Sequence, residues 1–172
     1  GKVEVENSHL GSIRIGFGNV QAHDRKYRRA IWDNTGEIIF HGSAHLSVAS
    51  KIVCSGRLEL GQDFMLNGDS TIIANKNIQI GNNCLISWNV QIMDTDFHPI
   101  YSLDNERLNP DKEIIICDHC WIGSRSNLLK GTKLSEGTIV AMGSTVTKEC
   151  SVPNVVICDN KILKYNVVWQ YE

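Results

Sequence analysis

Aliphatic residues recur at every sixth position in the last third of the chain, and a small side chain follows four residues after each of them. The aliphatic positions are Ile116, Ile122, Leu128, Leu134, Val140 and Val146, and the small ones are Cys120, Ser126, Thr132, Thr138, Ser144 and Cys150. A period of six differs from the 3.6-residue period of an amphipathic helix, and it fits a short strand followed by a tight corner. The pattern therefore predicts an all-β fold, a parallel β-helix whose stacked coils bury one aliphatic ladder.

The repeat continues upstream, with one interruption. Ile80, Ile86 and Ile92 keep the same phase, and an earlier block from Val48 to Ile72 differs by a two-residue slip near Ala74. The 24 residues from Ile92 to Ile116 equal four hexads, so the intervening segment leaves the pattern without shifting its phase. We therefore expect a single domain over 1–172. Its parts are an N-terminal non-repeat segment at 1–39, a β-helix at 40–155 with an extruded loop at 93–115, and a tail at 156–172.

Composition limits the functional classes. The chain has 172 residues and a formal net charge of −2, so it lacks the basic excess expected of a nucleic-acid or anionic-membrane binder. No apolar run approaches the roughly 20 residues that span a bilayer. The chain opens Gly-Lys-Val without an apolar segment, so we expect a secretory signal to be absent or already removed. Cys54, Cys84, Cys120 and Cys150 fall at inward repeat positions, where cysteine acts as a small hydrophobic residue. We expect a protein of the reducing cytoplasm, with no transmembrane segment and no nucleic-acid partner.

The segments Ile116–Ser124 and Val140–Lys148 resemble the hexapeptide-repeat acyltransferases, most closely the maltose, galactoside and exopolysaccharide O-acetyltransferases. The resemblance implies that three hexads form one triangular coil and that the β-helix is left-handed. It also implies a homotrimer with sites between subunits, acetyl-CoA as co-substrate and no required metal. γ-Class carbonic anhydrases share the scaffold and bind zinc through three histidines, but the close histidine pair that they need is missing.

The extruded loop carries the candidate catalytic residues. It contains the order Asp94-Thr-Asp96-Phe-His98-Pro. Removal of a proton from a sugar hydroxyl requires a base, and the pKa of histidine, about 6.5, suits that role near neutral pH. The family resemblance implies that a His-Pro pair supplies this base, so His98 is the candidate. A neighbouring carboxylate can orient such a histidine, and Asp94 and Asp96 are the two candidates for this role.

The same resemblance assigns the donor residues. Ser124 would lie beside the thioester, and Trp121 would form a wall of the donor channel. Met142 would offer a backbone amide to the pantetheine arm. Thr147 and Lys148 would lie near the coenzyme A phosphates, where a lysine acts as a point charge.

Three further residues are candidates for the acceptor. Asn67 and Asn75 have the spacing to His98 at which related enzymes bind their sugar, although Asn at a β-helix corner is also an ordinary turn former. Trp88 could stack on a sugar face or pack against another subunit.

These residues together predict an acetyl-CoA-dependent O-acetyltransferase that modifies a sugar hydroxyl in surface polysaccharide or glycan biosynthesis. Two alternatives stay open at this point. The acceptor could instead be an amino sugar or an amino acid, since nothing in the spacing separates these classes. The chain could also be a non-catalytic β-helical scaffold, because a fold does not by itself imply a function.

Overall fold

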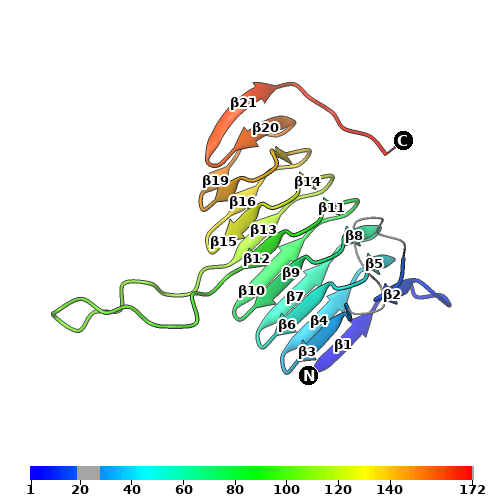
Figure 1. Cartoon of the computed structure of the whole chain (residues 1–172), viewed down its shortest axis with the longest axis horizontal. Coiled ribbons are helices and arrows are strands. Elements are labelled where there is room, and N and C mark those ends of the chain that lie inside the picture. The colour runs from blue at the N-terminus through cyan, green and yellow to red at the C-terminus, as the bar shows by residue number, and fades with distance from the viewer. Residues whose placement is uncertain (19–27, 172) are drawn as a thin grey trace.

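The protein is a left-handed parallel β-helix whose chain winds through three sheets (Figure 1). The computed structural model describes residues 1–18 and 28–171, and these ranges contain strands and loops but no helix. Neighbouring strands within the sheets run parallel, except for the last pair, β20 with β21. The all-β fold predicted from the six-residue repeat is confirmed. Within the described ranges, no helical segment has the length and apolar character needed to cross a membrane.

We name the sheets A, B and C in the order in which the chain passes through them. Sheet A contains β1 (Lys2–Val5), β4 (Glu37–Phe40), β7 (Arg57–Leu60), β10 (Asn77–Ile80), β13 (Ile114–Ile116), β16 (Lys133–Leu134) and β19 (Glu149–Cys150). Sheet B contains β2 (Ile13–Ile15), β5 (Ala44–Leu46), β8 (Phe64–Leu66), β11 (Leu85–Ile86), β14 (Trp121–Ile122), β17 (Ile139–Val140), β20 (Val155–Cys158) and β21 (Lys161–Tyr165). Sheet C contains β3 (Ile31–Asn34), β6 (Lys51–Cys54), β9 (Thr71–Ala74), β12 (Gln91–Met93), β15 (Asn127–Leu129) and β18 (Thr145–Val146).

The core is the stacked ladder that the repeat predicts. Ile86, Ile122 and Val140 are paired neighbours in sheet B, and each has an exposed fraction of 0%. Burial of one such aliphatic side chain stabilises the fold by roughly 1.5–3 kcal/mol, so the ladder dominates stability. The small residues that follow the aliphatic ones, such as Ser126 and Thr138, are buried at the corners, as expected.

The two-residue slip recurs in every early coil, so its placement at a single point near Ala74 was wrong. Pairing joins Lys51 to Thr71 and Thr71 to Gln91, which are 20 residues apart, whereas Asn127 and Thr145 are 18 apart. The extra residues lie at the corner between sheets C and A. There Cys54 and Ala74 each add a buried, inward-facing residue at the end of a strand.

At two of the three corners, one residue takes a left-handed backbone conformation in each of five successive coils. At the corner between sheets B and C these residues are Ala49, Asp69, Asn89, Arg125 and Gly143. At the corner between sheets A and B they are Asp63, Asn83, His119, Gly137 and Asn154. Asparagine, aspartate and glycine tolerate this conformation best, which explains their frequency between the aliphatic positions.

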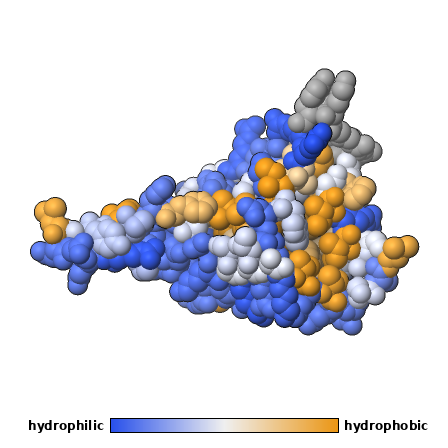
Figure 2. Space-filling view, turned by 90° about the horizontal axis from the view of Figure 1, so that it is seen from below, coloured by the Kyte–Doolittle hydropathy of each residue, from blue (hydrophilic) through white to orange (hydrophobic). Residues whose placement is uncertain are grey.

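The loop leaves the wall at the corner between sheets C and A, between β12 and β13. Gln91 pairs with Asn127 across 36 residues, twice the 18 of the next coil, so the insertion is as long as one whole coil. It projects far from the body (Figure 1), and its surface in the view of Figure 2 combines hydrophilic with hydrophobic residues. Phe97, Leu103 and Leu108 are among its exposed apolar side chains. The extruded loop expected from the unbroken phase is therefore present.

The sheets extend beyond the segment in which the repeat can be read. β1 pairs with β4 and β2 pairs with β5, so coils begin within the N-terminal segment 1–39. At the other end, β20 continues sheet B and β21 turns back along it. The division into a single domain with boundaries near residues 40 and 155 stays a prediction.

Candidate functional site

Five of the predicted site residues line one cavity at the corner between sheets B and C. This cavity has a volume of about 330 Å³, and we call it the B–C cleft. The predicted residues that it brings together are Asn67, Trp88, Trp121, Ser124 and Met142. Its other lining residues are Leu85, Ser87, Gly123, Ile139, Val140 and Ala141. The cleft therefore joins an apolar wall from three successive strands of sheet B with the turns that follow them.

Trp121 is held as a wall of the B–C cleft. Its indole N–H donates a hydrogen bond to the Ser87 hydroxyl at 3.0 Å, and its ring lies 6.0 Å from that of Trp169. Met142 lies at the mouth of the cleft with an exposed fraction of 73%. A partly fixed indole beside an exposed, flexible thioether gives a channel suited to an elongated, mostly apolar ligand.

Backbone amides at the cleft are available to a ligand, including that of Trp88 and two in the coils that follow it. The N–H groups of Ser124 and Met142 donate to no acceptor among the described residues. Both residues follow strands of sheet B, and they lie at equivalent turns of successive coils. Gly123 allows the two turns to approach, since a Cβ there would lie 2.7 Å from the Met142 nitrogen. Unpaired amides in a fixed position can stabilise a developing oxyanion.

His98 lies on the extruded loop, at a different corner from the cleft. Its side chain is exposed, and its backbone is held by Asn109, whose amide donates to the His98 carbonyl at 2.9 Å. The loop is ordered as a two-stranded arm, in which Tyr101 and Arg107 form an antiparallel bridge. The His98 side chain on this arm is therefore accessible to solvent.

Asp94 has a structural role in this arrangement. It is completely buried, and it occupies the same inward position as Ala74 one coil earlier. Its carboxylate accepts hydrogen bonds from the backbone N–H groups of Asn75, Lys76 and Asn77, each at 2.8 Å. Both oxygens are thus occupied in closing the corner between sheets C and A.

Asp96 fixes the base of the arm. Its carboxylate accepts hydrogen bonds from the Lys130 ammonium and from the Asn109 amide, the latter at 2.8 Å. The contact with Lys130, with a further contribution from Asn109, lowers the pKa of Asp96 below its usual range. Within the part of the chain that the structure describes, neither Asp94 nor Asp96 hydrogen-bonds the His98 ring. Their role as orienting groups stays a prediction.

The remaining three predicted residues lie away from the B–C cleft. The Asn75 side chain donates to Asp111 of the loop at 2.7 Å and accepts from the Ser55 hydroxyl at 2.7 Å. Thr147 lines a cavity of about 520 Å³ at the base of the arm. Four lysines also line that cavity: Lys76, Lys112, Lys130 and Lys133. Lys148 lines a third cavity, of about 150 Å³, near Asn160.

The predicted site residues therefore form two groups within one protomer. The first group lies at the corner between sheets C and A or on its loop, and the cleft residues lie at the corner between sheets B and C. The first group consists of Asn75, Asp94, Asp96, His98, Thr147 and Lys148. Sheet C separates the two corners. The candidate base and the candidate donor channel are thus not brought together by a single chain.

Sequence reasoning missed the contribution of the C-terminal tail. Trp169 is 7% exposed, and it stacks on His119 with 4.5 Å between ring centroids. The aromatic cluster Trp-Gln-Tyr at the end of the chain was the available signal, although nothing local indicates where it packs. His119 therefore anchors the tail.

Cys117 is exposed while Cys120 is buried, and no group of three metal-ligating side chains occurs among the described residues.

The sequence is similar to curated O-acetyltransferases. It is 46% identical over 68 residues to the polysialic acid O-acetyltransferase of Neisseria meningitidis, a match that covers 39% of this chain and 32% of the relative. It is 32% identical over 124 residues to the polysialic acid O-acetyltransferase of Escherichia coli O1:K1, which covers 70% of this chain and 38% of that protein. The chain is related to the hexapeptide-repeat O-acetyltransferases. It spans about a third of the length of these two relatives, and no protein-family model matches it.

A solved structure agrees with this relationship. The polysialic-acid-specific acetyltransferase NeuO superposes with a TM-score of 0.71 at 26% identity, over 81% of this chain and 66% of the NeuO chain. The family resemblance read from the Trp-Ile-Gly-Ser turn is confirmed by these relatives.

Proposed function

We propose that the protein is an acetyl-CoA-dependent O-acetyltransferase that modifies a hydroxyl group of a surface polysaccharide. The observation that carries the proposal is the B–C cleft, which joins an indole wall and unpaired backbone amides at the residues that the family resemblance assigns to the thioester. The names of the two relatives lead us to propose polysialic acid as the acceptor class. The cytoplasm, which supplies acetyl-CoA, is the proposed compartment.

In this proposal, His98 removes the proton from the acceptor hydroxyl, and the resulting alkoxide oxygen attacks the thioester carbonyl carbon. The amides of Ser124 and Met142 donate hydrogen bonds to the oxyanion. Collapse of the tetrahedral intermediate breaks the carbon–sulfur bond and releases coenzyme A as a thiolate, which takes the proton from the imidazolium. The steps need neither a metal ion nor a covalent enzyme intermediate.

We propose further that the site forms between subunits of a homotrimer. The two-group arrangement supports this, because the arm of one protomer can reach the cleft of another when three copies surround a common axis. Lys148 and the lysines around Thr147 would then contribute positive charge for the coenzyme A phosphates.

The first test measures donor binding and turnover separately. Calorimetric titration with coenzyme A should show one site per subunit, and mass spectrometry should detect acetyl transfer to polysialic acid. His98→Asn should lower turnover by about 10²–10⁴-fold, the usual contribution of a general base. The coenzyme A affinity should stay unchanged. Near-normal turnover of this variant, or no binding at millimolar coenzyme A, would overturn the proposal.

A mixing experiment tests the shared site. Met142→Trp should block the B–C cleft, and the exposure of this side chain makes the change compatible with the fold. Mixed trimers of His98→Asn and Met142→Trp chains should regain activity at about a quarter of their sites, since such sites combine an intact arm with an intact cleft. Each variant alone serves as the control. If mixing restores nothing, the arm and the cleft belong to the same chain.

A further inference from the structure

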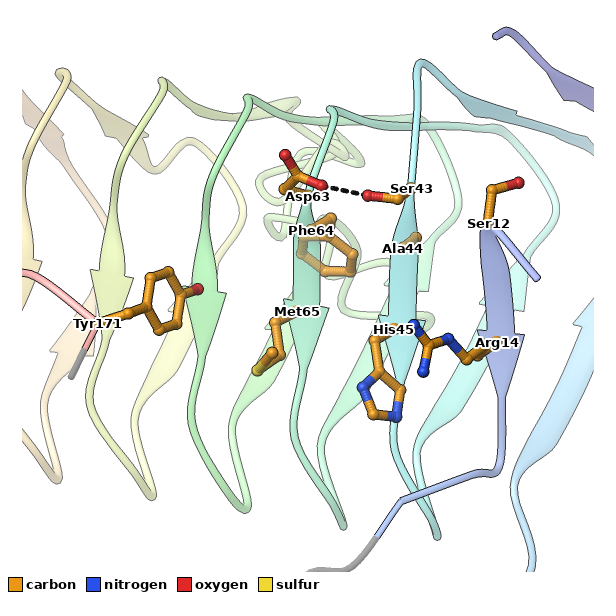
Figure 3. Close-up of a pocket in the computed structure, with 9 residues that line it drawn as sticks. All are labelled: Ser12, Arg14, Ser43, Ala44, His45, Asp63, Phe64, Met65 and Tyr171. Atoms are coloured by element: carbon orange, nitrogen blue, oxygen red, sulfur yellow. Dashed lines mark hydrogen bonds between the residues drawn. The ribbon is translucent and has the colours of Figure 1, made fainter. Parts of the chain in front are cut away.

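Another cavity lies on the outer face of sheet B, nearer the N-terminus than the B–C cleft. Its volume is about 310 Å³. Its lining residues come from β2, β5, β8 and their flanking turns, and from the C-terminal tail (Figure 3). They are Ser12, Arg14, Ser43, Ala44, His45, Asp63, Phe64, Met65 and Tyr171. We call it the Arg14 cavity.

Cationic and aromatic groups face each other across this cavity. Figure 3 shows Arg14 on one side, Tyr171 on the other, and Met65 and His45 between them. Arg14 is exposed and forms no ion pair or hydrogen bond with the rest of the described chain. Its guanidinium is therefore free to bind a carboxylate through two parallel hydrogen bonds.

The surroundings of Arg14 favour a sugar acid over a simple anion. The Tyr171 ring offers an apolar face on which a pyranose can stack, and its hydroxyl offers a hydrogen bond. His45 has one ring nitrogen, Nε2, at 2.9 Å from the Phe17 carbonyl, so the other nitrogen stays available. The Asp63 carboxylate accepts a hydrogen bond from the Ser43 hydroxyl, which holds this negative group at the strand end.

The tail that supplies Tyr171 is fixed in place. The Trp169 indole N–H donates to the His119 carbonyl at 2.8 Å, and the His119 ring lies 3.0 Å from the Trp169 carbonyl through Nε2. Trp169 and Tyr171 make an edge-on ring contact at 4.9 Å. The wall of the cavity is thus built by specific contacts.

The Arg14 cavity lies beside the candidate donor site on sheet B. Met65 of the cavity pairs with Leu85, which lines the B–C cleft. β8 and β14 are two coils apart, or about 10 Å at the usual strand spacing. Trp169 contacts Trp121 of the cleft and precedes Tyr171 of the cavity, so the tail borders both.

We propose that the Arg14 cavity is an acceptor subsite, which binds a carboxylate-bearing sugar residue of a polymer while another residue of that polymer is acetylated at the B–C cleft. This inference rests on the proposed function and adds a second point of attachment for the acceptor. It requires the acceptor to be an acidic polysaccharide long enough to extend over several coils of sheet B.

The test titrates wild type and Arg14→Gln with an octamer of sialic acid and with the same octamer after its carboxylates have been reduced to alcohols. Loss of one charge-assisted pair should weaken binding of the native octamer by about tenfold. Binding of the reduced octamer should change by less than about twofold, because it offers Arg14 no charge. Lys164→Gln, which removes an exposed positive charge on β21, is the matched control and should behave as wild type.

Three results would overturn the subsite: no binding of the octamer by wild type, equal losses for both octamers in Arg14→Gln, or an equal loss in Lys164→Gln. If Arg14→Gln changed the oligomeric state, the cavity would be a contact surface between two copies of the chain and not an acceptor subsite. Coenzyme A affinity is measured in the same samples. It reports on the proposed acetyltransferase function independently, so failure of the subsite and failure of the function are distinguishable.

Discussion

Replacement of Asp94 by asparagine should destabilise the fold without directly removing a catalytic group. The carboxylate is completely buried, and its two oxygens accept three backbone N–H groups at 2.8 Å. Asparagine has the same shape but keeps only one acceptor oxygen. Its amide group would direct N–H donors at backbone N–H donors, so at least one of these bonds is lost.

The size of the effect follows from these contacts. A hydrogen bond to a charged group contributes about 1.5–3 kcal/mol net, so loss of one such bond lowers the free energy of unfolding by about that amount. For a chain of 172 residues each kcal/mol shifts the melting temperature by about 2–4 °C, which predicts a fall of about 3–12 °C.

Urea unfolding followed by tryptophan fluorescence and a thermal melt would measure this effect, both at one fixed protein concentration because assembly also affects stability. Asp104→Asn is the matched control. Asp104 is an exposed residue of the same arm, and its replacement should change the free energy of unfolding by less than about 0.5 kcal/mol. If Asp94→Asn unfolded like the wild type but lost turnover, Asp94 would orient His98, and the structural interpretation would be refuted.

Two further predictions concern stability. His41 contacts Glu6 at 2.9 Å and Glu59 at 3.1 Å, and these carboxylates raise the pKa of His41. The contribution of His41 to the stability of the fold is therefore present below about pH 6.5 and is lost as the pH rises through the raised pKa. His41→Gln should lower the urea midpoint at about pH 6 and leave it unchanged at about pH 9, and equal effects at both would contradict this. Gly123→Ala places a Cβ 2.7 Å from the Met142 nitrogen, so we expect a loss of about 1–3 kcal/mol together with weaker coenzyme A binding. An unchanged melting temperature would show that the two turns are not in close contact.

The fold could be predicted from the sequence because the six-residue period records a repeated local geometry. Ile122 and Val140 are both inward, both completely buried and paired in register, as the period requires. The first coils were harder to recognise, because two additional residues at one corner, ending at Cys54 or Ala74, break the period once in each coil. Handedness came from the family resemblance, since the period by itself is compatible with either hand.

The candidate site was only partly predictable for a different reason. Trp121, Ser124 and Met142 belong to the repeat, and the repeat places them in one cleft. The environment of Asp94 depends on backbone groups one coil earlier, and sequence distance from His98 does not show this. The position of Trp169 depends on a contact with His119, 50 residues away, which no local pattern encodes.

The antiparallel strand β21 changes the edge that sheet B offers to another strand. β21 runs antiparallel to β20, and it carries Lys161 and Lys164 along its exposed length. A β-helix made only of parallel strands would end in open edges on which another molecule could add its own first coil, and repetition of that step would produce a filament. A reversed strand with charged side chains offers the wrong direction and an unfavourable surface for such growth. The β20–β21 hairpin thus disfavours the addition of a further coil at this edge of sheet B.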